Sequence, residues 1–435
     1  MSIDPPSPTG PPGNGSPALA EIAAEQSQGL AQIVGNRDLI AAWIDSIEEN
    51  HANPGVDAPD FAVDVIVPDG VERADASLAV RGQLLVWDRD VGAAVDVLTA
   101  AGLGAVPSEL ATPRVRILEL EPERPGSKAA ELVRAIGLLR AANLRASANH
   151  VLLYNYTAKT FVPPRLSPVP LPERGFDTGR GLGITVSIID SGVDPDRRGD
   201  RYLDGVTGEP DPGTEGMDPA VPVTGATGHG SLVAGIVRRV APGATVRVRR
   251  VMTADGLCSD VNVARAMLAE AKEGAQVINL SLGGPSLLDN TPLAMEDALA
   301  HLPRSILVVA AAGNDGSSTA RCYPAAFKRV VAVGATEPDG TPARYSNRGD
   351  WVDVSAQGSG VVSTFVNGTT SLQEQFAGDS PVAVASGTSF AAPQVSGAFA
   401  ALLADGIAPA DALAALTATG RMEPDVGVIV RLLDQ

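Results

Sequence analysis

Cysteine, aromatic residues and positive charge are all scarce in this sequence of 435 residues. Two cysteines are too few for a scaffold held together by disulfides. The formal net charge of −18 argues against nucleic acid or an anionic membrane as the main partner. No apolar run approaches the length of a membrane span, and the first residues include no segment typical of a secretory signal. We therefore expect a cytoplasmic protein.

The rest of the composition is that of a globular protein, with 44% hydrophobic and 19% charged residues. The length allows two domains, and the sequence changes character several times along the chain. We predict a disordered N-terminus at 1–17, a helical segment at 18–56, a small domain at 57–160, a Pro-rich linker at 161–178 and a larger domain at 179–435.

The small domain is predicted from the order of its elements. Strand patterns occur at 81–87, 104–110, 114–120 and 149–155, and helical patterns at 88–103 and 127–144. This strand-helix-strand-strand-helix-strand order is that of a ferredoxin-like α+β domain.

The larger domain has short apolar strands that alternate with helical patterns. The strands are predicted at 184–190, 244–252, 275–282, 305–312 and 329–335, with one of the helices at 259–274. Strands that are apolar on both faces indicate a mainly parallel sheet covered by helices on both sides. In such α/β folds, functional groups collect at the carboxyl ends of the strands.

Four polar residues stand at such element ends. Asp190 ends a strand, His229 opens an apolar helix, Asn314 follows a strand and Ser389 begins an alanine-rich helix. Each alone has an ordinary structural interpretation as a turn or a helix cap. Together they supply a carboxylate, a base, an amide donor and a nucleophile, and the order Asp, His, Ser is known for such triads.

Pro393 follows Ser389 by only four positions. A proline in or near the first turn of a helix loses little, because the N–H groups there have no partner within the helix. The sequence does not explain why proline is used there in place of alanine.

The motifs around these four residues resemble those of the subtilisin-like serine proteases, or subtilases. The matching stretches are DSGV (190–193), HGSLVAG (229–235), AAGN (311–314) and GTSFAAPQVSG (387–397). The resemblance runs from about residue 180 to the C-terminus. It implies a serine endopeptidase that acts on peptide or protein substrates and needs no cofactor for its chemistry.

The resemblance also implies a role for individual residues. Ser389 would be the nucleophile, His229 the general base and acid, Asp190 the group that orients His229, and Asn314 with Ser389 the oxyanion hole. Ser281, Leu282 and Gly283 would pair with an extended substrate, and Ala311, Ala312 and Gly313 would wall the pocket beside it. Subtilases often bind Ca²⁺, but the acidic stretch 194–220 lacks a familiar ligand spacing. We therefore name no metal ligands and favour a solvated loop, with a structural Ca²⁺ site as the alternative.

Two functions other than proteolysis stay open. The first is a binding scaffold that uses the same fold without hydrolysis, and the second is an esterase or peptide ligase that uses the same acyl-enzyme. The complete set of catalytic residue types favours the protease.

The position and topology of the small domain are similar to those of the inhibitory pro-domains of subtilases. Intramolecular inhibition, with cleavage in the connector 155–178, is therefore one hypothesis. A permanently attached regulatory or partner-binding domain is the other. The resemblance also implies that Cys258 and Cys322 lie in loops that border the substrate cleft. A reducing cytoplasm favours free thiols there, and a disulfide between them is the alternative.

Overall fold

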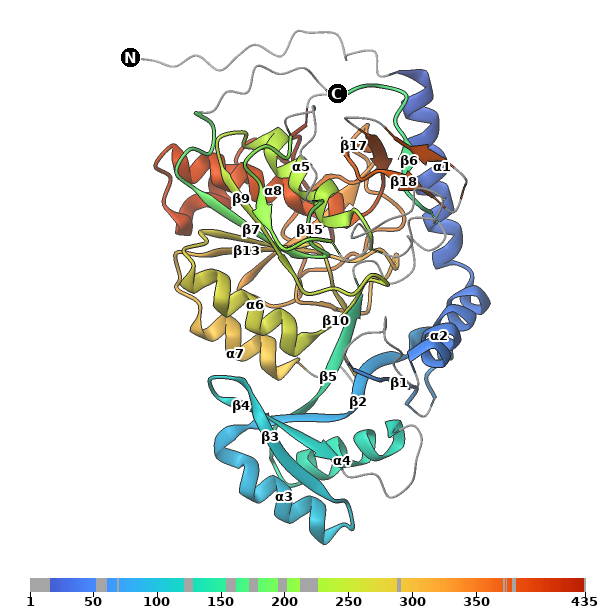
Figure 1. The fold of residues 1–435 in the computed structure, drawn as a ribbon, viewed down its shortest axis with the longest axis vertical. Coiled ribbons are helices and arrows are strands. Elements are labelled where there is room, and N and C mark those ends of the chain that lie inside the picture. Colours follow the sequence, from blue (N-terminus) through green and yellow to red (C-terminus); the bar gives the residue numbers. More distant parts are fainter. Residues whose placement is uncertain are drawn as a thin grey trace.

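The computed structural model describes residues 16–51, 61–68, 70–120, 128–153, 162–171, 179–194, 202–211, 226–287, 291–370, 372, 374–377 and 381–433. The disorder predicted for 1–17 falls on residues outside these ranges, except that helix α1 already begins at Pro17. Much of the connector 155–178 also lies outside them. The larger part of the molecule stands above the smaller one in Figure 1, and the N-terminal helices run beside both.

A nine-stranded sheet forms the centre of the larger part, in the order β21-β22-β16-β15-β13-β11-β7-β9-β8. Neighbouring strands from β22 to β8 are parallel, and only β21 is antiparallel to its neighbour. The strands are β7 (Thr185–Asp190), β8 (Thr207–Gly208), β9 (Thr245–Arg250), β11 (Val277–Leu280), β13 (Leu307–Ala311), β15 (Val330–Thr336), β16 (Val354–Gln357), β21 (Arg421–Glu423) and β22 (Gly427–Ile429).

Helices cover both faces of this sheet. On one face, α5 (His229–Val240), α8 (Thr388–Ala404) and α9 (Ala412–Thr417) pack on valine-rich strands in one apolar cluster. On the other face, α6 (Asp260–Lys272) and α7 (Leu293–His301) form a second cluster. The strands need this double cover because both of their faces are apolar. The predicted α/β fold class is confirmed.

The smaller part has the strand order β5-β2-β4-β3, which is the ferredoxin-like arrangement. Its elements are β2 (Ser77–Trp87), α3 (Val91–Ala100), β3 (Ala105–Thr112), β4 (Val115–Leu120), α4 (Ala129–Ala141) and β5 (Ala146–Leu153). One face of the sheet packs on α3 and α4. An additional strand that the sequence did not indicate, β1 (Val63–Ile66), pairs with the first half of β2.

The sheet of the smaller part continues into the larger part. Strand β10 (Leu257–Ser259) pairs antiparallel with β5, and Cys258 lies opposite Leu152. Cys258 is therefore in a strand, which corrects the predicted loop. The face of the small sheet opposite α3 and α4 shares an apolar cluster with α6 and α7, including Leu85 and Met267. The two parts thus have a common apolar core.

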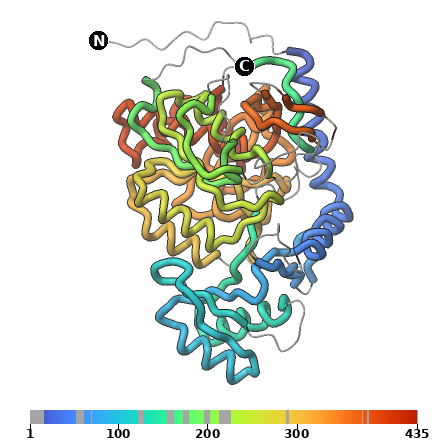
Figure 2. The backbone as a smooth tube through the Cα atoms, in the orientation of Figure 1, coloured from blue at the N-terminus to red at the C-terminus, as the bar shows by residue number. Residues whose placement is uncertain are grey.

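Two helices precede the small domain. Helix α1 (Pro17–Val34) lies along the larger part, and α2 (Arg37–His51) packs on β1 and β2 of the smaller part, as Figure 2 shows. The short elements are β6 (Arg165–Leu166), β12 (Gly284–Pro285), β14 (Cys322–Tyr323), β17 (Val361–Thr364), β18 (Gly368–Thr369), β19 (Gln375–Phe376), β20 (Val382–Ala385), η1 (Arg73–Asp75), η2 (Asp88–Asp90) and η4 (Pro409–Asp411). Among the described residues, no helix combines the length and hydropathy needed to cross a bilayer.

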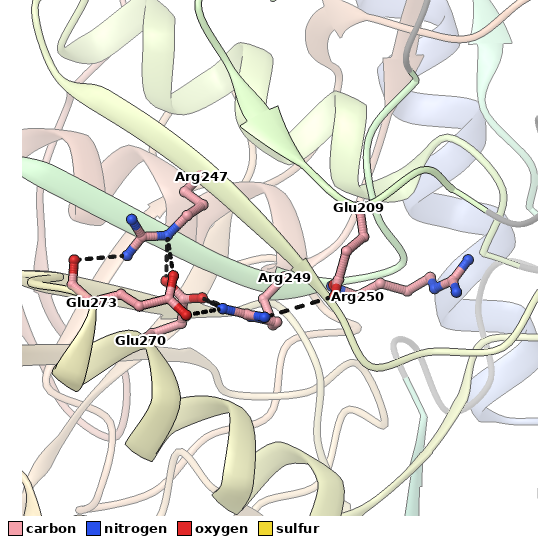
Figure 3. Close-up of polar contacts among 6 residues, drawn as sticks. All are labelled: Glu209, Arg247, Arg249, Arg250, Glu270 and Glu273. Carbon is pink, nitrogen blue, oxygen red and sulfur yellow. Dashed lines mark hydrogen bonds and ion pairs between the residues drawn. The ribbon is translucent and has the colours of Figure 1, made fainter.

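An ion-pair network fixes β9 to the helix packed below it (Figure 3). The carboxylate of Glu270 in α6 is fully buried and lies 2.7 Å from both Arg247 and Arg249 of β9. Arg249 also contacts Glu209 at 3.7 Å, so the network extends to the chain after β8. A buried charge needs such pairing, because the penalty for removing it from water is large. The network holds the edge of the sheet beside β7, the strand that ends at Asp190.

Candidate functional site

Asp190 and His229 form a buried pair at the carboxyl end of β7. Asp190 is the last residue of β7 and His229 the first of α5. The distance between His229 Nδ1 and Asp190 Oδ1 is 2.6 Å, and both side chains are fully buried. Because a carboxylate accepts hydrogen bonds, this contact holds the imidazole proton on Nδ1. The other ring nitrogen, Nε2, is then the one that can accept a proton.

Glycine is required at position 230, where the start of α5 meets the loop after β7. A Cβ on Gly230 would lie 1.9 Å from the carbonyl oxygen of Gly192, so the helix of His229 approaches the loop after Asp190 at backbone distance. Gly230 N also donates to Ser191 Oγ at 3.1 Å. Any side chain at position 230 would push His229 away from Asp190.

Asp211 supports the same pair, and sequence reasoning missed it. It was placed in the stretch 194–220, for which we expected a solvated loop, but it is fully buried. Its Oδ2 accepts hydrogen bonds from Ser191 Oγ at 2.8 Å and from Gly228 N at 2.9 Å. Asp211 therefore connects the residue after Asp190 with the residue before His229. A lone aspartate among many exposed acids carries no signal that would single it out.

Ser389 lies in the first turn of α8, after Gly387, whose φ of +151° suits glycine. Its Oγ donates to the carbonyl oxygen of Ser281 at 3.2 Å. The next residue, Phe390, has its ring centroid 5.6 Å from that of His229. The fold thus brings the start of α8, the segment after β11 and the imidazole of His229 to the same end of the sheet.

Pro393 has a structural explanation here. It lies inside α8, past the first turn, where an ordinary residue would donate its N–H to the carbonyl of Ser389. Proline has no N–H, and Ser281 Oγ donates to this carbonyl instead, at 2.9 Å. Asn279 Nδ2 donates to the same Ser281 Oγ at 3.0 Å, and Ser396 Oγ donates to Asn279 Oδ1 at 2.8 Å. Because of the proline, this carbonyl of Ser389 links the start of α8 to the segment that follows β11.

Asn314 is oriented by the residue before Ser389. Its Oδ1 accepts from Thr388 N at 2.8 Å and from Thr388 Oγ1 at 3.0 Å. The oxygen end of the amide thus faces the start of α8, and the NH₂ end is directed away from Thr388. Asn347, a second residue missed from the sequence, binds the loop around it, because its Nδ2 donates to Ala312 O at 3.0 Å and its Oδ1 accepts from Asp315 N at 3.1 Å.

Cys322 lies between the two segments predicted to line the cleft. A Cβ on Gly283 would be 2.7 Å from Cys322 Sγ, and a Cβ on Gly313 would be 3.2 Å from it. Of the neighbouring predicted residues, Ser281, Leu282, Ala311 and Ala312 are all buried. Cys322 belongs to the short strand β14 that pairs with β12, where a loop was expected.

Both cysteines are free and buried. Burial, with the nearby charges of Asp190 and Asp260, raises the pKa of the Cys258 thiol. Burial, with the charge of Asp315, raises the pKa of the Cys322 thiol. Because the thiolate is the reactive form, both are structural thiols near neutral pH.

Gly283 is already paired with the small domain. Its N–H donates to Leu153 O at 3.0 Å, and Leu153 N donates to Gly283 O at 3.2 Å. This is an antiparallel bridge between the end of β5 and the segment predicted to pair with substrate. The backbone edge at Gly283 is therefore occupied by the chain's own residue.

Within the described residues, no group of three or more His, Cys, Asp or Glu side chains is placed to hold a metal ion. Much of the acidic stretch 194–220, for which Ca²⁺ was considered, lies outside those residues, at 195–201 and 212–220.

A family model described as the subtilase family matches residues 181–421. The "Thermophilic serine proteinase" of Bacillus sp. (strain AK1) is 35% identical over 249 residues, which are 53% of this chain and 55% of that protein. Subtilisin BL of Lederbergia lenta is 32% identical over 253 residues, or 55% of this chain and 83% of that protein. The crystal structure of fervidolysin from Fervidobacterium pennivorans has a TM-score of 0.57 and 20% identity, over 87% of this chain and 63% of that one.

Proposed function

The chain belongs to the subtilase family, and we propose that it is a serine endopeptidase whose nucleophile is Ser389. The observation that carries this proposal is the buried contact of 2.6 Å between His229 and Asp190, beside the start of α8. The arrangement suits a base that must be neutral, fixed in one tautomer and ready to accept a proton on Nε2. Hydrolysis by this set of groups uses no cofactor.

The proposed reaction proceeds through an acyl-enzyme. Ser389 Oγ attacks the substrate carbonyl carbon while His229 Nε2 takes its proton, and the imidazolium formed is stabilised by Asp190. The amide of Asn314 donates to the oxyanion, where a preorganised donor is most effective. His229 then gives the proton to the leaving amine, the C–N bond breaks, and water releases the acyl group by the same route in reverse.

The small domain restrains the enzyme in this proposal. It occupies the edge at Gly283 through Leu153, and it contacts α6 and α7 through an apolar face. Polar contacts fix its position: Asp297 of α7 accepts from Thr112 Oγ1 and from Arg114 Nε, each at 2.7 Å. A substrate that pairs with Gly283 would have to displace Leu153.

Cleavage is proposed in the connector 155–178, of which residues 155–161 and 172–178 lie outside the described part. Leu153 is antiparallel to Gly283, and Ser281 is the residue whose carbonyl oxygen contacts Ser389 Oγ. An extended substrate in the register of Leu153 would present to Ser389 the residue two positions further along its chain, and in this sequence that residue is Asn155. We therefore expect the bond cut to follow Asn155, at the start of the connector.

Intact-mass analysis of the wild type beside Ser389→Ala tests the proposed function. We expect the wild type to yield a C-terminal fragment that begins at Tyr156 and to be labelled by a fluorophosphonate probe. The Ser389→Ala variant should stay full-length and unlabelled. A wild type that is labelled and turns over esters but not peptides would indicate the esterase, and one that is neither labelled nor cleaved would indicate the binding scaffold.

Asp297→Ala should weaken the restraint in the full-length chain. The substitution removes a fully buried carboxylate that accepts three hydrogen bonds from the tip of the β3–β4 hairpin. Arg114 is exposed, so water screens part of its charge. We expect docking of the small domain to weaken by about 1.4 kcal/mol, which raises the fraction of molecules with the small domain undocked by about tenfold.

The measurement is the initial rate of cleavage of an added peptide by the uncleaved chain. The substitution Asp405→Ala is the control, because Asp405 is an exposed acidic residue at the end of α8, in the larger part. We expect its rate to stay within about twofold of the wild type. Equal rates for the wild type and both variants would contradict the restraint.

A further inference from the structure

Gln26 is a buried polar side chain in the middle of α1, with only 3% of its surface exposed. Its Nε2 donates to Val384 O at 3.0 Å and to Pro163 O at 3.3 Å. Its Oε1 accepts from Ser386 Oγ at 2.9 Å. A buried amide is destabilising unless it is hydrogen-bonded, so these three bonds fix one position of α1 on the larger part.

Ser386 is the link between this helix and the active site. Its Oγ accepts from Gly360 N at 2.9 Å while it donates to Gln26. It stands where the chain leaves β20 and turns into α8, three residues before Ser389. The following residue, Gly387, donates to Gly358 O at 2.8 Å. Gln26 therefore binds both the end of β20 and the turn that leads to the nucleophile.

The packing around Gln26 is with the larger part throughout. Ala23 closes over Gly360, where an added Cβ would lie 2.4 Å from the Ala23 Cβ. Leu30 shares an apolar cluster with Tyr345. Figure 1 shows α1 alongside this part of the molecule, away from the ferredoxin-like sheet. Although α1 precedes the small domain in the chain, it is packed as an element of the larger part.

We propose that α1 is a positioning element of the active site, in which Gln26 acts through Ser386 to fix the turn that carries Ser389. This inference rests on the proposed role of Ser389. It also assigns the N-terminal region two separate actions: the small domain restrains the enzyme, whereas α1 supports it. After cleavage in the connector, the N-terminal fragment still supplies α1, so the active enzyme is a complex of both fragments.

The test compares Gln26→Met with Gln28→Met in the full-length chain. Both substitutions replace an amide with a thioether of similar size on the same helix, but Gln28 is exposed. One readout is hydrogen exchange at Gly360 and Gly387, whose amides report the turn directly. The other is the rate at which a fluorophosphonate labels Ser389.

We expect Gln26→Met to speed exchange at both amides and to slow labelling by about 10- to 100-fold, because small misplacements of a reacting group have effects of this size. Gln28→Met should match the wild type in both readouts. Ser386→Ala removes the other partner of this link without placing a charge in the core, so it is the second variant if the methionine chain does not fold, and it should also speed exchange and slow labelling.

The labelling and exchange results together decide whether Gln26 positions Ser389. Labelling of Gln26→Met or Ser386→Ala at the wild-type rate overturns the inference, with or without faster exchange. A wild type that is not labelled at all overturns the proposed function, and exchange at Gly360 and Gly387 then still decides whether Gln26 holds the turn.

Discussion

His229→Ala is expected to lower peptide turnover by on the order of 10⁶-fold, as loss of the base does in enzymes that use this set of groups. The side chain is fully buried, its Nδ1 is held 2.6 Å from Asp190, and Phe390 packs beside its ring. No other histidine is placed to replace it, since His51, His150 and His301 lie on α2, β5 and α7. Without the imidazole, the proton of Ser389 has no acceptor during attack.

The measurement is turnover of a peptide chosen from a cleavage library, beside the rate of self-cleavage by intact mass. His301→Ala is the control, because it removes an imidazole from the end of α7, and its turnover should stay within about tenfold of the wild type. Turnover by His229→Ala within tenfold of the wild type would exclude His229 as the base.

Asp190→Asn is expected to lower turnover by on the order of 10⁴-fold while the fold is kept. The carboxylate accepts from Ser191 N at 2.7 Å and from His229 Nδ1 at 2.6 Å, so it fixes the proton on Nδ1. An asparagine can turn its NH₂ toward Nδ1, which then becomes the acceptor, and the ring proton moves to Nε2. The nitrogen that should accept the proton of Ser389 would then already carry one.

Asp405→Asn is the matched substitution, since Asp405 is an exposed residue at the far end of α8. Its turnover should equal that of the wild type within about twofold. Thermal unfolding of each variant shows whether a loss of turnover comes from the wrong tautomer of His229 or from loss of the fold. If Asp190→Asn retained a tenth or more of the wild-type turnover, orientation of His229 by Asp190 would be ruled out.

The parallel sheet and the positions of the four motif residues at the ends of its strands and helices could be predicted because local sequence encodes them. Strands such as β7 and β13 are apolar runs, and the residue that ends or follows each run stands at the carboxyl edge of the sheet. Asp190 and Asn314 were found by this rule. The helix of Ser389 was found from its glycine and alanine pattern, and its proline was explained only by the contact with Ser281.

What the sequence did not indicate depends on contacts between distant segments. Asp211 supports His229 across a loop, and Asn347 supports Asn314 from a position that no motif marks. Strand β10 has only three residues and forms because β5 is there to pair with it. The helical pattern of α1 was visible, but amphipathicity does not say which surface a helix covers, and only the bonds of Gln26 identify it.

The sheet shared through β10 and β5 has a consequence for the handling of this protein. When the small domain departs, β10 becomes an edge strand with unpaired backbone groups, and the apolar side chains of α6 and α7 that it covered face water. Exposed edges and apolar patches of this kind promote self-association. The larger domain alone is therefore expected to aggregate more readily than the complete chain. The small domain would then serve the solubility of the protein as well as the restraint proposed above.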